Sequence, residues 1–230
     1  MNRKNRQLVI IGDSAFAQIA YHYFSDDGGY DVAAFCVEKD YIKTEKFFDI
    51  PVISFDQLTK FYPPESNDIF VAITYGNLNR LRTRFVNEVQ KLGYSPASYV
   101  SPHAYISKQA KLGEHCFVFE NNVIQPFTQI GNNVILWSGN HIGHHSNIGD
   151  NCFISSHVVI SGYVNVGQSC FFGVNSTVVN NINIGDDCWI GPSVTISQDA
   201  KAGSLFPPVE AHLSSISTHK FFKLKELSNV

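Results

Sequence analysis

The stretch from Ile130 to Gly149 decides the fold, and it reads IGNNVILWSGNHIGHHSNIG. Aliphatic residues occupy every sixth position in it: Ile130, Leu136, Ile142 and Ile148. The same step continues in both directions, from Val100 to Ile196, and all seventeen positions on it are apolar. Neither the helical period nor the strict alternation of a half-buried strand produces this pattern.

A second period of eighteen residues lies on top of the first. Glycines follow an aliphatic position at each repeat: Gly113, Gly131, Gly149, Gly167, Gly185 and Gly203. Three six-residue steps make one coil with three flat faces, and we expect each glycine to give its corner backbone freedom. Stacked coils would share one aliphatic interior. The repeat predicts a parallel β-helix of about five and a half coils over residues 100–196.

Four of the five cysteines fit the same register, each two residues before an aliphatic position: Cys116, Cys152, Cys170 and Cys188. Small residues take this place in other coils, at Ala104, Ala110, Ser146 and Ser176. Because a free cysteine behaves as a small hydrophobe, a core role is favoured over a metal site or a disulfide. An odd number of cysteines without CxxC pairs is typical of reduced thiols in a cytosolic protein.

Composition narrows the class of protein further. Lys and Arg number 17 against 20 for Asp and Glu, a formal net charge of −3, which argues against a nucleic-acid partner. No apolar run is long enough for a membrane span or a secretory signal, so we expect a soluble, cytoplasmic protein without membrane insertion. Between Leu112 and Ala200 there is no Lys or Arg at all.

The N-terminal part has a different pattern, in which strands alternate with helices. Expected strands cover residues 7–11, 31–37, 50–53 and 69–73, and expected helices run from the Gly12 turn to about Phe24 and over residues 77–92. This order predicts a Rossmann-like parallel sheet. Gly12 lies at the strand–turn–helix junction where phosphates bind, but Ala15 and Ala17 replace the other glycines of a GxGxxG pattern. A nucleotide site and a plain tight turn therefore both stay open.

Polar residues at the ends of the expected strands are further candidates for ligand contacts: Glu38, Thr74, Tyr75 and Asn77.

The densest chemical feature is Asn140-His141-Ile-Gly-His144-His145, in which Ile142 points inward and the last two histidines lie on the outer wall near a corner. A solvent-facing corner, a metal site and a general base are the alternatives. No Cys or carboxylate stands at ligand spacing, whereas imidazole suits proton transfer near neutral pH.

The hexapeptide repeat, the Gly12-Asp-Ser loop and the segment His144–Asp150 together resemble the bacterial nucleotide-sugar acyltransferases of the PglD/NeuD type. The resemblance covers nearly the whole chain. It implies an α/β Rossmann-like nucleotide-sugar domain at residues 1–98 and a left-handed parallel β-helix, an all-β solenoid, at residues 99–203. It also implies a homotrimer with the cosubstrate acetyl-CoA between neighbouring β-helices, and no metal.

Residues 204–230 are expected to form a C-terminal cap or tail, because the open end of a β-helix needs covering. Contact of this tail with CoA or with the acceptor of a neighbouring subunit is the alternative. The nearest cations in sequence for the CoA phosphates are Lys201, Lys220, Lys223 and Lys225.

The resemblance also assigns roles to single residues. His144 matches the catalytic histidine of the family, while His145 replaces its acidic neighbour, so we expect Asn140 or His141 to orient the base. Acetyl-CoA contacts fall on Phe153, Gly162, Val174 and Pro192. Contacts to the nucleotide sugar fall on Ser14, Ala15, Phe16, Val37, Glu38 and Thr74, beside the Gly12 turn.

The implied activity is acetyl-CoA-dependent N-acetylation of a nucleotide-linked amino-deoxy sugar, such as a 4-amino-4,6-dideoxy sugar, for surface-glycan or lipopolysaccharide synthesis. The amine would attack the thioester directly while His144 takes its proton. The alternatives are sugar O-acetylation of the sialic-acid type and a non-catalytic β-helix that binds a nucleotide sugar. Carbonic-anhydrase-like chemistry would need metal ligands such as His141, His144 and His157, whose spacing carries no such signature.

Overall fold

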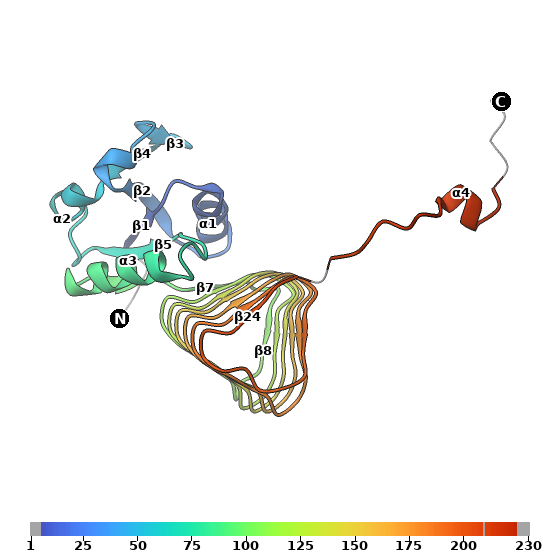
Figure 1. The fold of residues 1–230 in the computed structure, drawn as a ribbon. Helices are drawn as coiled ribbons and strands as arrows, with labels where there is room; N and C mark the ends of the chain where they lie inside the picture. The colour runs from blue at the N-terminus through green and yellow to red at the C-terminus, as the bar shows by residue number, and fades with distance from the viewer. Residues whose placement is uncertain (1–5, 209, 225–230) are drawn as a thin grey trace.

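The computed structural model describes residues 6–208 and 210–224. An α/β domain sits against one side of a triangular β-helix, which Figure 1 shows end-on. Lys225, one of the cations expected near CoA, lies outside the described residues.

The α/β domain contains a six-stranded sheet in the order β3-β4-β2-β1-β5-β6, parallel except for β3. The strands are β1 (Gln7–Ile11), β2 (Asp31–Val37), β3 (Lys46–Phe47), β4 (Ile50–Ser54), β5 (Asn67–Val71) and β6 (Ser95–Pro96). The helices are α1 (Ala15–Asp26), α2 (Leu58–Phe61) and α3 (Arg80–Lys91), with short 3₁₀ turns at Lys39–Tyr41 and Phe55–Gln57.

Alternation along β1 divides the sheet between two hydrophobic cores. Leu8 and Ile10 pack on the side of α1, whereas Val9 and Ile11 pack on the side of α3. The predicted strands and helices are present, but α3 begins three residues later than expected. Residues 77–79 all have positive φ, between 49° and 66°, so they form a left-handed turn that a right-handed helix cannot include.

The β-helix confirms the six-residue register along its whole length. Its first face contains β7 (Tyr99–Val100), β10 (Phe117–Val118), β13 (Ile135–Leu136), β16 (Phe153–Ile154), β19 (Phe171–Phe172), β22 (Trp189–Ile190) and β24 (Leu205–Phe206). The second contains β8 (Tyr105–Ile106), β11 (Val123–Ile124), β14 (His141–Ile142), β17 (Val159–Ile160), β20 (Thr177–Val178) and β23 (Thr195–Ile196). The third contains β9 (Lys111–Leu112), β12 (Gln129–Ile130), β15 (Asn147–Ile148), β18 (Asn165–Val166) and β21 (Asn183–Ile184).

Five of the six glycines of the eighteen-residue period, Gly113 to Gly185, have another cause than the predicted one, whereas Gly203 has φ 74° and fits the prediction. None of those from Gly113 to Gly185 has positive φ. A Cβ on Gly149 would lie 2.6 Å from the carbonyl carbon of Gly167 in the next coil, so close stacking of coils selects glycine. The left-handed corner residues come elsewhere, at every sixth position from His115 to Ser193, and most of them are not glycine.

The cysteines are core residues, as the register predicts. All five are free and buried. The thiols of Cys116, Cys152 and Cys170 each donate to a glycine carbonyl in the next coil, with a sulfur–oxygen distance of 3.2 Å. Burial raises the pKa of Cys116 to about 11, so its thiol stays protonated and is no nucleophile at neutral pH.

A buried polar seam joins the two domains. The guanidinium of Arg82 is fully buried and donates to seven oxygens, among them the carbonyls of Thr74, Asn133 and Asn151. Nε2 of His115 accepts the backbone N–H of Val71 at 2.8 Å. The α/β domain is therefore fixed to the coils by hydrogen bonds as well as by aromatic packing.

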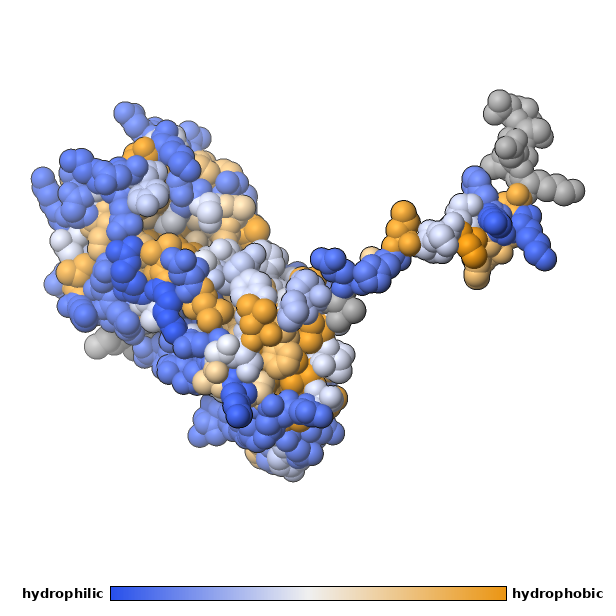
Figure 2. Space-filling model, viewed as in Figure 1, coloured by the Kyte–Doolittle hydropathy of each residue, from blue (hydrophilic) through white to orange (hydrophobic). Residues whose placement is uncertain are grey.

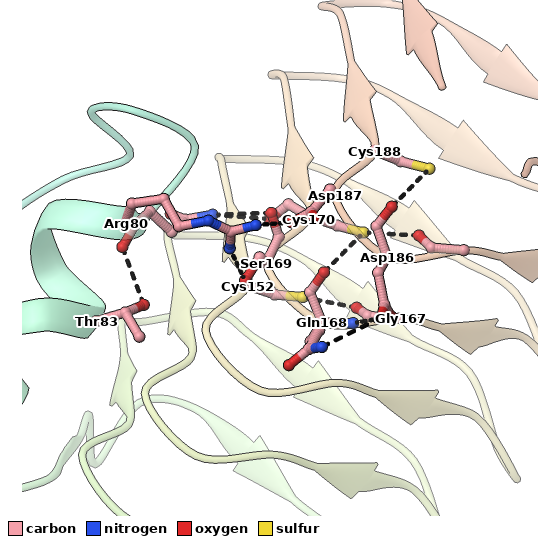
Figure 3. A network of polar contacts seen from close by, with 12 residues as sticks. Arg80, Thr83, Cys152, Gly167, Gln168, Ser169, Cys170, Asp186, Asp187 and Cys188 are labelled. Atoms are coloured by element: carbon pink, nitrogen blue, oxygen red, sulfur yellow. Dashed lines mark hydrogen bonds and ion pairs between the residues drawn. The ribbon is translucent and has the colours of Figure 1, made fainter. Parts of the chain in front are cut away.

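Arg80 extends this seam to the surface. It reaches from the start of α3 to Ser169 Oγ (2.7 Å) and to the Asp187 carboxylate (2.6 Å), as Figure 3 shows. Both side chains of the ion pair are more than a third exposed, so solvent screens their attraction.

The predicted cap is not formed within the described part of this single chain. After β24 the chain runs away from the β-helix, and all of residues 210–224 are exposed, including the short helix α4 (Thr218–Phe221). Apolar side chains are visible at this end of the β-helix in Figure 2. Leu205 on β24 is 69% exposed. β24 lies inside the segment expected as a cap or tail, residues 204–230, but it still pairs with β22 of the β-helix. The bounds of this segment stay a prediction.

Candidate functional site

A pocket of about 510 Å³ opens at the carboxyl ends of β1, β2 and β5. Gly12 forms its floor with φ +119°, and a Cβ there would lie 2.9 Å from the Ala72 carbonyl oxygen. The chain then turns into α1, whose first hydrogen-bonded amide within the helix is that of Gln18. Free amides at a helix N-terminus beside a glycine turn are the usual setting for a phosphate group.

Five of the seven predicted substrate residues line this pocket: Gly12, Ser14, Val37, Glu38 and Thr74. Asn77, a strand-end candidate, lines it too, whereas Tyr75 packs on the Phe171 ring of the first face. Ala15 is the first residue of α1, outside the lining. Phe16 is 2% exposed and packs on Phe117, so its side chain belongs to the core. Any contact of Phe16 with a ligand would involve its backbone only.

Sequence analysis missed three polar residues that line the pocket: Asp13, Tyr41 and Arg84. Arg84 on α3 donates twice to Oε1 of Glu38, at 3.0 and 3.1 Å, which leaves Oε2 free to accept from a ligand. Helical spacing placed Arg84 on α3, but only the fold brings it opposite the end of β2.

The histidine corner lies between the second and third faces of the β-helix. His144 and His145 are exposed, and their Nδ1 atoms are 3.1 Å apart. The backbone N–H of His144 donates to Oε1 of Gln125 at 2.9 Å. Its ring rests on Gly162, where a Cβ would lie 2.8 Å from Cε1. Among the described residues, Nε2 of His144 has no hydrogen-bond partner, as a proton-accepting base requires.

The expected orienting residues do not reach this corner. Asn140 is 1% exposed, its amide donates to the Trp137 carbonyl, and its Oδ1 accepts from Val158, so both its polar groups serve the turn. His141 lies on β14, and no hydrogen bond or ring contact between the described residues joins it to His144. Neither residue contacts the ring of His144 within the described part of this chain, and its role in orienting the base stays a prediction.

The predicted acetyl-CoA residues do not form one cluster in a single chain. Gly162 lies beneath His144, whereas Val174 and Pro192 lie at a different corner, between the first and second faces. Phe153 is 2% exposed and packs against Tyr75 and Phe171. The structure thus places Phe153 in the domain seam, since the aromatic ladder of the first face buries it, and a contact of Phe153 with acetyl-CoA stays a prediction.

Two other kinds of site are absent from the described residues. No group of three or more His, Cys, Asp or Glu side chains within residues 6–208 and 210–224 is arranged to hold a metal ion. In the same part of the chain, no helix has the length and apolar character needed to cross a membrane.

A family model matches part of the β-helix. Residues 127–162 match the bacterial transferase hexapeptide (six repeats), a range that includes His144 and His145. None of the curated proteins compared with the chain matches it.

Solved structures match over most of the chain. The acetyltransferase domain of PglB from Neisseria gonorrhoeae is 22% identical with a TM-score of 0.78, covering 87% of this chain and 96% of that one. PerB from Caulobacter crescentus, in complex with CoA and GDP-perosamine, is 26% identical with a TM-score of 0.78, covering 86% and 92%. A histidine-to-asparagine mutant of perosamine N-acetyltransferase from the same organism reaches a TM-score of 0.80 at 26% identity, covering 91% and 97%. These matches confirm the predicted fold, an α/β domain followed by a left-handed β-helix.

Proposed function

We propose that this chain, an acyltransferase that carries the bacterial hexapeptide repeat and resembles the PglD/NeuD type, N-acetylates a nucleotide-linked amino-deoxy sugar with acetyl-CoA. The observation that carries the proposal is the pairing of two sites in one fold. A phosphate-binding turn lies in the α/β domain, and an exposed histidine with a free Nε2 lies on the coils. PerB, which has this fold, holds CoA and GDP-perosamine.

The nucleotide end of the substrate fits the pocket at Gly12. Free amides at the start of α1 suit a diphosphate, and the Glu38–Arg84 pair offers both an acceptor and donors to the base. A sugar attached to this diphosphate would extend out of the α/β domain toward the β-helix of the assembly.

The chemistry needs one base and no covalent intermediate on the enzyme. The sugar amine attacks the thioester carbonyl and loses a proton to Nε2 of His144. As the carbon–sulfur bond breaks, the same proton passes from Nε2 to the departing CoA thiolate. The products are the amide and free CoA thiol, so atoms and charges balance.

A homotrimer would complete the site. The outer side of the third face carries a ladder of hydrogen-bonded asparagines, Asn147 to Asn165 to Asn183, which suits contact with water. The second face instead exposes Tyr105 (62%) and Val159 (39%). An apolar face of this kind suits contact with another copy, which would bring the Val174–Pro192 corner of one chain toward His144 of the next.

The test is turnover of the purified full chain with acetyl-CoA and a panel of UDP-, dTDP- and GDP-linked 4-amino-4,6-dideoxy sugars. Thiol release and product mass are measured for wild type, His144→Ala and a control, His22→Ala, which alters a histidine on α1 that contacts Phe48. We expect release with one sugar, a loss of about 10²- to 10⁴-fold in His144→Ala, and little change in the control. No release with any amine, or full activity of His144→Ala, would contradict the proposal.

A further inference from the structure

The ring of His145 is held in a ladder of aromatic side chains. Phe127, His145 and Tyr163 follow one another at the eighteen-residue period, all with φ between 59° and 65°. His145 stacks on Tyr163 with ring centroids 4.8 Å apart and planes 14° apart, and Phe127 lies 4.7 Å away on the other side. Tyr163 stacks on the His145 ring and Phe127 packs against it at a tilt of 37°, so these two neighbours hold the ring in place.

This fixed ring presents one nitrogen to the base. Nδ1 of His145 lies 3.1 Å from Nδ1 of His144, and the two rings are nearly perpendicular, at 87°. Two neutral imidazoles in this contact share a single hydrogen, so one Nδ1 donates and the other accepts. The direction of this one hydrogen bond decides which nitrogen of His144 is free.

We infer that His145 is a positioning residue whose Nδ1 accepts the Nδ1–H of His144 and thereby keeps Nε2 of His144 unprotonated. The inference rests on the proposed function, because it gives His145 the role that the acidic neighbour of the catalytic histidine has in the family. The opposite direction would place the hydrogen of His144 on Nε2 and leave no base. When His144 gains a proton, the same contact becomes a charge-assisted hydrogen bond, which stabilises the transient imidazolium.

Two substitutions separate the nitrogen from the ring. His145→Phe keeps an aromatic ring in the ladder, where the chain already places Phe127 at the same left-handed corner, but removes the acceptor. His145→Asn removes the ring but keeps an acceptor, Oδ1, at the position of Nδ1. Asparagine also suits the corner, since Asn121, Asn151 and Asn181 occupy equivalent ones.

The primary measurement is the tautomer of His144, read from the side-chain ¹⁵N chemical shifts of the full chain labelled in histidine and assigned with His144→Ala. We expect the hydrogen on Nδ1 in wild type and in His145→Asn, and a shift toward Nε2 in His145→Phe. In turnover, kcat falls at least about tenfold in His145→Phe with KM for both substrates unchanged, whereas His145→Asn stays within a few-fold of wild type.

A wild-type His144 with its hydrogen on Nε2 would overturn the inference. So would a loss of turnover in His145→Asn with turnover kept in His145→Phe, because this pattern would make the ring stack rather than the nitrogen the important feature. If the tautomers behave as expected while wild type acetylates no amino sugar, the hydrogen-bond assignment stands and the proposed function fails.

Discussion

Two histidine sites in this protein have opposite surroundings. His115 lies in the domain seam, 1% exposed, with both ring nitrogens bonded, one to the Val71 amide and one to Oδ1 of Asn133. His144 lies on an exposed corner with Nε2 free. Both occur in coils of the same repeat. A buried ring with both nitrogens satisfied acts as structure, whereas an exposed ring with one oriented nitrogen is available for chemistry.

The largest effect on the seam is expected from Arg82→Met. The change removes seven hydrogen bonds, four of them buried, and we expect a loss of about 3–5 kcal/mol in the free energy of unfolding, measured by urea titration. Arg80→Met is the matched control on the same helix. Its ion pair is exposed, so a change of about 0–1 kcal/mol is expected. Similar losses in both variants would show that burial does not distinguish the two arginines.

His115→Gln tests the buried histidine through the pH dependence of the free energy of unfolding. Burial lowers the pKa of His115 to about 3, while the unfolded chain takes up a proton near pH 6.5. The stability contributed by the neutral ring is therefore present above pH 6.5 and is lost as the pH falls toward 3. The advantage of wild type over the variant should shrink by as much as about 1.4 kcal/mol per pH unit below 6.5.

Urea titrations of both chains at pH 7, 6 and 5 measure this difference. Other titrating groups affect both chains alike, so they cancel. An advantage that stays constant with pH would mean that His115 is not held neutral in the folded state.

At the exposed corner, Gly162→Ala should act on chemistry and hardly on stability. The new methyl group would meet the ring of His144 at 2.8 Å, and the ring is free to rotate away. We expect kcat to fall by about tenfold or more, with the thermal midpoint within a few degrees of wild type. Unchanged turnover would show that the resting place of the His144 ring on Gly162 is not needed.

The smallest effect is expected from deleting residues 209–230. Since residues 210–224 are exposed, the free energy of unfolding of the chain should change by less than about 0.5 kcal/mol. A clear drop in the thermal midpoint would instead favour the cap predicted from the sequence, formed on a neighbouring subunit.

The sequence predicted the structure of the β-helix more completely than the residues of the candidate site. The positions from Val118 to Ile196 are buried as the repeat predicts, because one inward residue per face is a local property of the chain. Glu38 was predicted from the rule that ligands bind at strand ends and Gly12 from the strand–turn–helix junction, and both line the pocket. Arg84 and the seam of Arg82 were missed, since no spacing along α3 tells which domain its side chains face.

By itself, the sequence determined the β-helix, its register, the core position of the cysteines and the strand–turn–helix junction at Gly12. These follow from periods of six and eighteen residues and from local backbone demands. Only the tertiary structure decided that close packing of coils selects the repeated glycines, that Phe153 lies in the seam, and that His145 is the neighbour that contacts His144. These features depend on which coil lies beside which side chain. Such contacts join residues that are far apart in the sequence, so the six- and eighteen-residue periods do not predict them.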